Sequence, residues 1–193
     1  MKAHATRHSR AVTAIATALL VLTPAASADV ITFKQTGVGS GTLNGVPFPA
    51  SNFLITSIGD TANVGWFEDG WYLDHNSSSI TIAGLGTVGL VSPTETFVNN
   101  TNHVVGYTRA DTLYDLYDGP ANPAFAAWDM LSPIGPISGT ASLLQWTATP
   151  VLTTGGVLVF NDGNCDAIFT AVIPEPASFV ACGLVSLLAR RRR

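Results

Sequence analysis

Short apolar stretches separated by polar turns run along most of the chain. Val30–Phe33, Phe53–Ile58 and Ser79–Ala83 are rich in the β-branched and aromatic residues that are typical of strands. Clusters of glycine, asparagine, aspartate and threonine bound these stretches and favour turns. The pattern predicts further strands at residues 85–91, 96–98, 103–108, 140–149, 156–160 and 167–172. About ten short strands at a spacing of roughly 8–12 residues predict an all-β fold, an antiparallel β-sandwich or jelly roll.

Two hairpins can be placed from their turn residues. Asn44-Gly45 is the two-residue turn of a hairpin within Thr42–Phe48, and Pro47 places that strand at an edge, since proline cannot donate to a neighbouring strand. Val64–Phe67 and Trp71–Leu73 form an aromatic hairpin around the three-residue loop Glu68-Asp69-Gly70.

One stretch departs from the strand pattern. In Asp111–Asp118, Asp111 is suited to cap a helix, and Leu113, Leu116 and Tyr117 share a face at helical spacing. Gly119-Pro120 would end this helix. We therefore expect one short helix in an otherwise all-β domain. The run from Pro133 to Gly139 is expected to be a rigid crossing loop.

The N-terminal segment has the features of a secretory signal peptide. A basic region that includes Lys2, Arg7 and Arg10 precedes an apolar stretch, and Ala26 and Ala28 form an A-x-A cleavage site. We expect signal peptidase to remove residues 1–28, so that the chain is exported.

The C-terminal segment combines a rigid motif, a short apolar run and a basic end. Pro174, Glu175 and Pro176 precede thirteen uncharged residues, which as a helix span roughly 20 Å against a bilayer core of about 30 Å. The short span predicts a transient membrane helix, with a weak permanent anchor as the alternative. The residues expected in the membrane include Ala177, Phe179, Val180, Leu184, Val185, Leu187 and Leu188. Positive charge stays in the cytoplasm, which orients the helix through Arg190, Arg191, Arg192 and Arg193.

This order of features resembles the PEP-CTERM sorting signal of Gram-negative bacteria, over residues 173–193. The resemblance implies that the chain is a substrate of exosortase, a multi-pass membrane enzyme of the transpeptidase type, much as LPXTG tails are substrates of sortase. Residues 29–172 would then be the exported domain. Asp111–Asp118 and the loop Gly135–Gly139 are similar to segments of β-rich ectodomains in PEP-CTERM proteins, a resemblance that implies no particular activity.

The charge of the exported domain differs from that of the whole chain. The whole chain has nine basic and thirteen acidic residues, a formal charge of −4. Only Lys34 and Arg109 lie between the terminal segments, against twelve acidic residues, which gives −10. Such a surface repels nucleic acid, so no nucleic-acid partner is expected. Cys165 is the single cysteine of this domain and is expected to be buried.

Catalytic and metal-binding patterns are weak. Asp74, His75 and Ser77–Ser79 suggest a hydrolase, but there is no Gly-x-Ser-x-Gly elbow, and a loop histidine without a catalytic role is favoured. No catalytic residue, metal site or cofactor is expected, with calcium as the alternative cofactor. The calcium candidates are the turn-like Asp162, Asn164 and Asp166, and the helically spaced Asp111, Asp115 and Asp118.

Three aromatic residues are candidates for contact with sugar rings. Trp66, Trp71 and Tyr72 offer apolar ring faces with polar edges, although aromatic residues of a sandwich more often pack in its core. The sequence as a whole leads to the hypothesis of a non-enzymatic protein with a structural or adhesive role. Its place would be the cell surface or the exopolysaccharide matrix. A carbohydrate-binding module is the alternative, and a secreted hydrolase a weaker one.

Overall fold

The computed structural model describes residues 29–174, which fold into an antiparallel β domain with two short 3₁₀ helices. The predicted signal peptide and the sorting segment from Glu175 onward lie outside the described residues. No helix within residues 29–174 is long and apolar enough to cross a membrane. The elements are β1 (Val30–Leu43), β2 (Val46–Asp60), η1 (Thr61–Asn63), β3 (Gly65–Phe67), β4 (Gly70–Asp74), β5 (Ser77–Ile82), β6 (Gly86–Gly89), β7 (Thr94–Asn99), β8 (Val104–Arg109), β9 (Tyr114–Ala121), η2 (Pro123–Ala127), β10 (Ile134–Leu143), β11 (Val151–Thr153), β12 (Gly156–Phe160) and β13 (Gly163–Val172).

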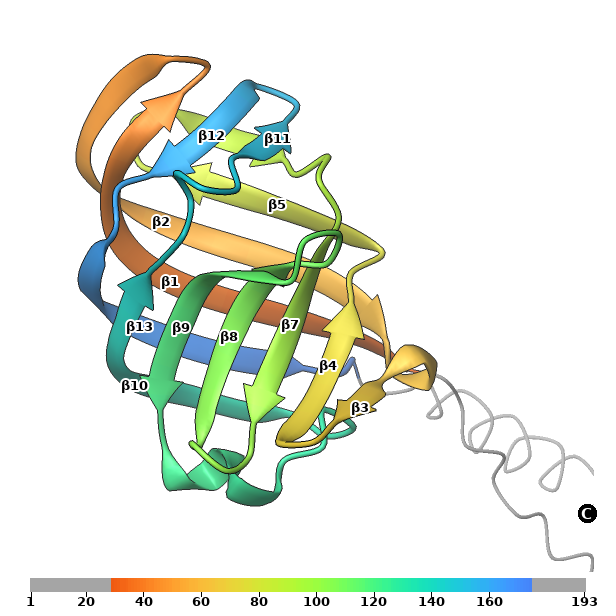
Figure 1. The fold of residues 1–193 in the computed structure, drawn as a ribbon. Helices are drawn as coiled ribbons and strands as arrows, with labels where there is room; N and C mark the ends of the chain where they lie inside the picture. Colours follow the sequence, from red (N-terminus) through yellow and green to blue (C-terminus); the bar gives the residue numbers. More distant parts are fainter. Residues whose placement is uncertain (1–28, 175–193) are drawn as a thin grey trace, which may run out of the picture.

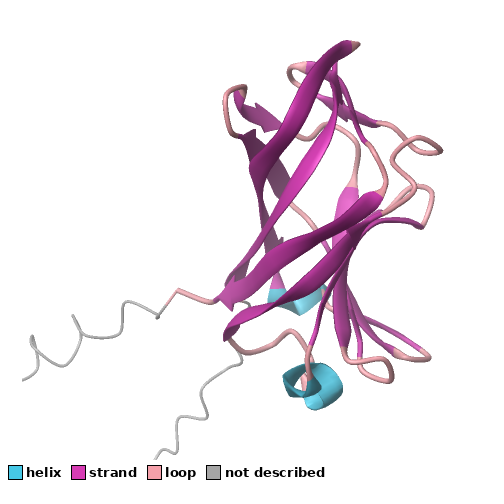
Figure 2. Ribbon diagram, turned by 90° about the vertical axis from the view of Figure 1, so that its left-hand side faces the viewer, coloured by secondary structure: helices cyan, strands magenta, loops and turns pink. Residues whose placement is uncertain are grey.

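The strands form a sheet that curls over to make two layers. Its order is β3-β4-β7-β8-β9-β10-β13-β1-β2-β5-β6, and the short β11-β12 pair joins β1. In Figure 1, β4, β7, β8 and β9 lie in front and cross the long strands β1, β2 and β13 at a steep angle. The side view of Figure 2 shows the two layers facing each other. The predicted sandwich-like all-β fold is therefore confirmed.

Both predicted hairpins are present. β1 and β2 pair up to Leu43 and Val46, with Asn44 and Gly45 in the turn at φ 51° and 76°, as a two-residue turn of this type requires. β5 pairs only with residues 53–58 of β2, so Pro47 lies where β2 has a partner strand on one side alone. The turn of the aromatic hairpin β3-β4 is one residue shorter than predicted, because Gly70 belongs to β4 and pairs directly with Phe67, which leaves only Glu68 and Asp69 in the turn.

Two sequence predictions are wrong. Asp111–Asp118 is not a helix: a turn leads into β9, which pairs with β8 and β10. Residues 134–139 are not a crossing loop but the first half of β10, paired with β13. In both cases hydrogen bonding to neighbouring strands outweighs the local signal of helical spacing or of proline and glycine.

A β-bulge at Leu116 explains why β9 imitates a helix in sequence. Tyr117 pairs with Tyr107 of β8, whereas Asp115 already pairs with the next residue of β8, Thr108, which leaves Leu116 as the extra residue. Leu116 and Tyr117 are consecutive, yet both are fully buried. The apolar spacing that suggested a helix is the spacing of a bulged strand.

Two apolar clusters fill the space between the layers. One surrounds Trp146 and Phe160, whose ring centroids lie 4.9 Å apart, and Trp146 donates to the carbonyl of Leu116 over 2.6 Å. The other surrounds Phe169, which stacks on Phe33 at 6.3 Å. Cys165 is half-buried and packs against the first cluster, so the prediction of burial holds in part.

Candidate functional site

A groove of about 640 Å³ lies over β3, β4, β7, β8 and the turn into β9. Its volume lies within the range of roughly 300–1,000 Å³ that is usual for ligand sites. Aromatic and acidic side chains dominate its lining: Phe67, Tyr72, Asp74, Glu95, Phe97, Asn99, Thr108, Ala110, Leu113 and Asp115. A hollow of about 740 Å³ over β1, β2, β10 and β13 is lined mainly by small residues, so the aromatic and acidic groove is the better candidate site.

The register of the strands aligns the acidic side chains in one row. Asp74 of β4 pairs with Glu95 of β7, Glu95 with Thr108 of β8, and Thr108 with Asp115 of β9. Residues that pair directly across an antiparallel sheet point to the same face. Three carboxyl groups therefore share the outer face of the front layer, in one line across four strands.

An aromatic row runs beside the acidic one. Tyr72 pairs with Phe97, and each ring covers a glycine on the neighbouring strand. A Cβ atom on Gly65 would lie 2.3 Å from the ring of Tyr72, and one on Gly106 would lie 2.1 Å from that of Phe97. Any larger residue at these two positions would push the rings out of place. The glycines thus let the aromatic rings lie flat along one side of the groove.

Glu95 is the most unusual group in the groove. It is only 9% exposed, and its carboxylate makes no side-chain hydrogen bond within residues 29–174. Burial, and then the negative charges of Asp74 and Asp115, raise its pKa to about 7. Unlike Oδ1 of Asp118, the oxygen atoms of Glu95 are not sealed from solvent, so this unpaired carboxyl group is open to a ligand in the groove.

Two aspartates of β9 continue the acidic character of this face. Thr108 donates to Asp115 over 3.0 Å, yet burial still raises the pKa of Asp115. Asp118 pairs opposite Gly106, and its Oδ1 is buried without a partner. Burial and the charge of Asp115 raise the pKa of Asp118 to about 6. The bulge at Leu116 brings both carboxyl groups to one face, although their spacing in a regular strand would separate them.

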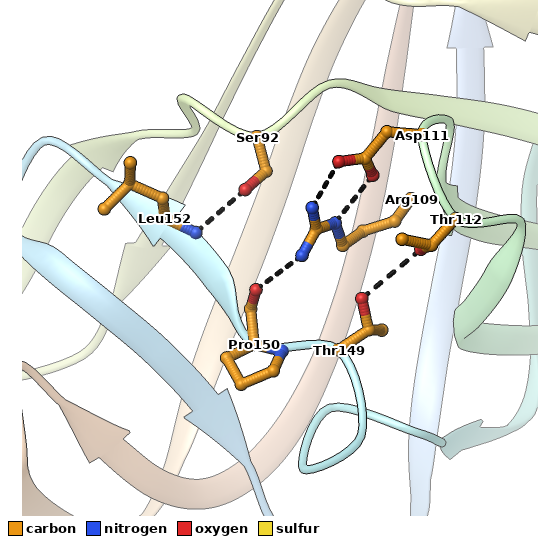
Figure 3. A network of polar contacts seen from close by, with 7 residues as sticks. All are labelled: Ser92, Arg109, Asp111, Thr112, Thr149, Pro150 and Leu152. Carbon is orange, nitrogen blue, oxygen red and sulfur yellow. Dashed lines mark hydrogen bonds and ion pairs between the residues drawn. The ribbon is translucent and has the colours of Figure 1, made fainter.

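Arg109 forms a set of polar contacts with Asp111 and Pro150, next to the turn that lines the groove. Arg109 forms an ion pair with Asp111 through two hydrogen bonds and donates to the carbonyl of Pro150 over 2.8 Å (Figure 3). The bond to Arg109 lowers the pKa of Asp111. The same turn carries Leu113, which is 73% exposed and lines the groove. The bonds of Arg109 thus tie this turn to the loop that precedes β11.

His75 lies between the layers rather than in an exposed catalytic loop. Its Nδ1 and Nε2 lie 2.9 Å from the hydroxyl groups of Thr94 and Thr96, and its ring lies between Phe33 and Tyr107. Burial lowers its pKa to about 3, so the imidazole is neutral. Since both ring nitrogens bond to threonine hydroxyls, His75 has a structural role in this arrangement.

Of the three serines after His75, Ser78 belongs to the same polar network. The Ser78 hydroxyl lies 2.6 Å from the Tyr107 hydroxyl and 2.7 Å from that of Ser57, and Tyr107 donates to Thr94 over 2.9 Å. Tyr107 thus separates Ser78 from His75, and the arrangement lacks the serine–histidine contact that nucleophilic catalysis requires. The network instead satisfies polar groups where the two apolar clusters meet.

The predicted calcium candidates Asp162, Asn164 and Asp166 line one hollow at the start of β13, and only two of the three are acidic. Asp162 lies in the turn before β13, whereas Asn164 and Asp166 are part of that strand. Asp111 pairs with Arg109 and lies apart from Asp115 and Asp118 on β9. Within residues 29–174, no group of three or more histidine, cysteine or acidic residues is placed to hold a metal ion.

The three predicted sugar-contact residues are divided between two faces. Tyr72 lines the groove, whereas Trp66 and Trp71 pair with each other on the opposite face of the hairpin. Trp71 packs against the second apolar cluster, and Trp66 is 65% exposed. Phe67, Glu95 and Phe97 line the groove but were not predicted as site residues from the sequence. The alternation Glu95-x-Phe97-x-Asn99 along β7 was the available signal, since it places three groove residues on one face.

The chain matches no protein-family model, no curated protein and no solved structure. In the groove, an aromatic row, an acidic row and an unpaired carboxyl group lie together on the outer face of the sheet.

Proposed function

We propose that this protein is exported and has an adhesive role at the cell surface or in the exopolysaccharide matrix, where its domain binds a polysaccharide chain in the groove. The observation that carries the proposal is the row of Tyr72 and Phe97 beside the row of Asp74, Glu95 and Asp115. The protein acts by binding and not by catalysis.

The two rows suit the two kinds of surface that a sugar ring presents. The apolar face of a pyranose packs on aromatic rings, here Phe67, Tyr72 and Phe97, while its hydroxyl groups need polar partners. Carboxyl groups, Asn99 and Thr108 supply these partners along the other side of the groove. The groove is open to solvent, which suits a segment of a long chain.

Export and sorting are supported by the two ends of the sequence. Residues 1–28 have the pattern of a signal peptide for signal peptidase, and residues 173–193 resemble a substrate tail for an exosortase-type enzyme. The formal charge of −10 between them suits a protein that must remain soluble outside the cell. In this proposal the membrane helix is a transient anchor that is lost when the protein reaches the outer surface.

Processing of the tail can be followed with two tags, one after Asp29 and one after Arg193. We expect the first tag at the outer surface on a shortened species and the second tag lost from it, because the short apolar span holds the chain only until cleavage near Pro174-Glu175-Pro176. Replacing Glu175 by alanine should block processing. A full-length species that keeps both tags in the inner membrane would contradict this proposal.

Glycan binding can be tested by substituting the aromatic row. We expect Phe97→Ala to weaken binding to an exopolysaccharide or to glycan oligomers about tenfold or more, because stacked rings contribute about 1–3 kcal/mol. Binding is measured by affinity electrophoresis and calorimetry. Trp66→Ala is the matched control, since Trp66 is exposed on the other face of the same hairpin. If Trp66→Ala abolishes binding and Phe97→Ala does not, the groove is not the site.

A further inference from the structure

The groove is lined by acidic side chains and by no positively charged side chain. Asp74, Glu95 and Asp115 line it, and none of its lining residues is basic. Residues 29–174 contain two basic side chains, Lys34 and Arg109. Lys34 lies on β1 in the other layer, and Arg109 is bound to Asp111 and Pro150. The acidic row is therefore left without a cationic partner from the described part of the chain.

Glu95 points to the kind of group that is missing. The Glu95 residue is only 9% exposed, and its carboxyl group, which faces the groove, accepts no side-chain hydrogen bond from residues 29–174. The groups that face it are Asp74 from β4, Thr108 from β8 and Asp115 from β9, of which none carries positive charge. A ligand with a positively charged donor would satisfy Glu95 and relieve the repulsion among the three carboxyl groups.

The aromatic row narrows the choice of cation. Tyr72 and Phe97 lie two residues along their strands from Asp74 and Glu95, a separation of roughly 6.6 Å. This separation is comparable to the width of one sugar ring. A ring that packs on the aromatic row would thus place a substituent in the acidic row, and the aromatic faces would also attract its positive charge. A bare metal ion would make no use of these rings.

Building on the proposed function, we propose that the groove binds a polysaccharide of amino sugars with free amines. The sugar ring packs on Tyr72 and Phe97, and its ammonium group donates hydrogen bonds to Glu95, flanked by Asp74 and Asp115. N-acetylation of the amine removes its positive charge and adds bulk, so the acetylated polymer binds less tightly.

The test compares two oligomers that differ only in acetylation. The full-length chain is titrated by calorimetry at pH 6 with a β-1,4-linked glucosamine hexamer and with its N-acetylated counterpart. We expect the free amine to bind about tenfold more tightly, the gain typical of one charge-assisted hydrogen bond. Glu95→Gln should remove this preference. Asp162→Asn, which deletes one charge in the exposed turn before β13, is the control for net charge and should keep the preference.

Proton release provides a second readout that a merely structural Glu95 would not give. Because the pKa of free Glu95 is raised to about 7, the carboxyl group is mostly protonated at pH 6 and should lose its proton when the ammonium group binds. Calorimetry in buffers of different ionisation enthalpy should detect net release of protons for the wild type and clearly less release for Glu95→Gln.

The outcomes separate this inference from the proposed function. Equal affinity for the two hexamers, or an unchanged preference in Glu95→Gln, would overturn the amino-sugar inference and leave glycan binding intact. If neither hexamer binds, and no glycan tested in the comparison of Phe97→Ala with Trp66→Ala binds, both the amino-sugar inference and the proposed glycan binding are overturned. Tighter binding of a hexalysine peptide than of the amino-sugar hexamer would identify a basic peptide as the ligand and overturn the inference.

Discussion

Replacing Phe169 by alanine is expected to lower the free energy of unfolding by about 3–5 kcal/mol. Phe169 is fully buried on β13, and its ring packs against those of Phe33, Phe125 and Trp128 at centroid distances of 6.3, 5.7 and 5.6 Å. Alanine would leave a cavity between three aromatic rings that cannot close without moving both layers. The loss is measured by denaturant unfolding and compares with a total stability of about 5–15 kcal/mol for most domains.

The neighbouring residue gives the matched control. Ile168 lies on the opposite face of β13 and is 44% exposed, so Ile168→Ala is expected to cost under about 1 kcal/mol. A comparable loss in the two variants would mean that β13 does not present alternate residues to core and solvent. If Phe169→Ala fails to fold, Phe169→Leu, with an expected loss of about 1–2 kcal/mol, allows the same comparison.

Replacing Glu95 by glutamine is expected to stabilise the protein at alkaline pH. The pKa of Glu95 is raised from 4.5 to about 7 in the folded state. Below pH 4.5 the carboxyl group is protonated in both states and costs nothing. Between pH 4.5 and 7 the unfolded state ionises while the folded state stays protonated, so stability falls over this range and levels off once the folded state ionises above pH 7. The difference of about 2.5 pKa values corresponds to at most about 3 kcal/mol, which solvent screening at the open groove reduces to about 1–2 kcal/mol at pH 8.

The variant and the wild type should therefore differ by about 1–2 kcal/mol at pH 8 and by little at pH 4. Thermal or denaturant unfolding at the two pH values measures this difference. Both proteins contain His75, so comparing them at the same pH removes its contribution to stability. The pKa of His75 is lowered to about 3, so this residue lowers the stability of the fold as pH falls below 6.5. A difference that is the same at both pH values would show that Glu95 is not buried as described.

A gain in stability on removal of Glu95 would also bear on function. Groups that destabilise the folded state commonly belong to binding or catalytic sites, since their partner is supplied by the ligand. The structural network around His75 behaves differently: its polar groups bond to one another, so substitutions there should only destabilise. The contrast distinguishes the hydrogen-bonded polar groups around His75 from Glu95, whose carboxyl group has no hydrogen-bond partner within the described residues.

Much of the strand pattern could be predicted from local sequence. The Asn44-Gly45 turn, the aromatic hairpin at Trp66 and Trp71 and the strand at Phe53–Ile58 all follow from turn residues and side-chain type. Asp111–Asp118 was misread because a bulged strand places consecutive apolar residues inward, much as one turn of a helix does. Periodicity over one turn cannot distinguish the two without the partner strand.

The sequence by itself determined the all-β class, the position of most turns, and the acidic, lysine-poor character of residues 29–172. These properties depend on neighbouring residues and on composition. Only the tertiary structure decided that Asp74, Glu95 and Asp115 form one row, that Tyr72 belongs with Phe97 and not with Trp71, and that His75 lies between two threonines. The reason is that strand register joins residues far apart in sequence, and a shift by one residue would turn each side chain to the other face.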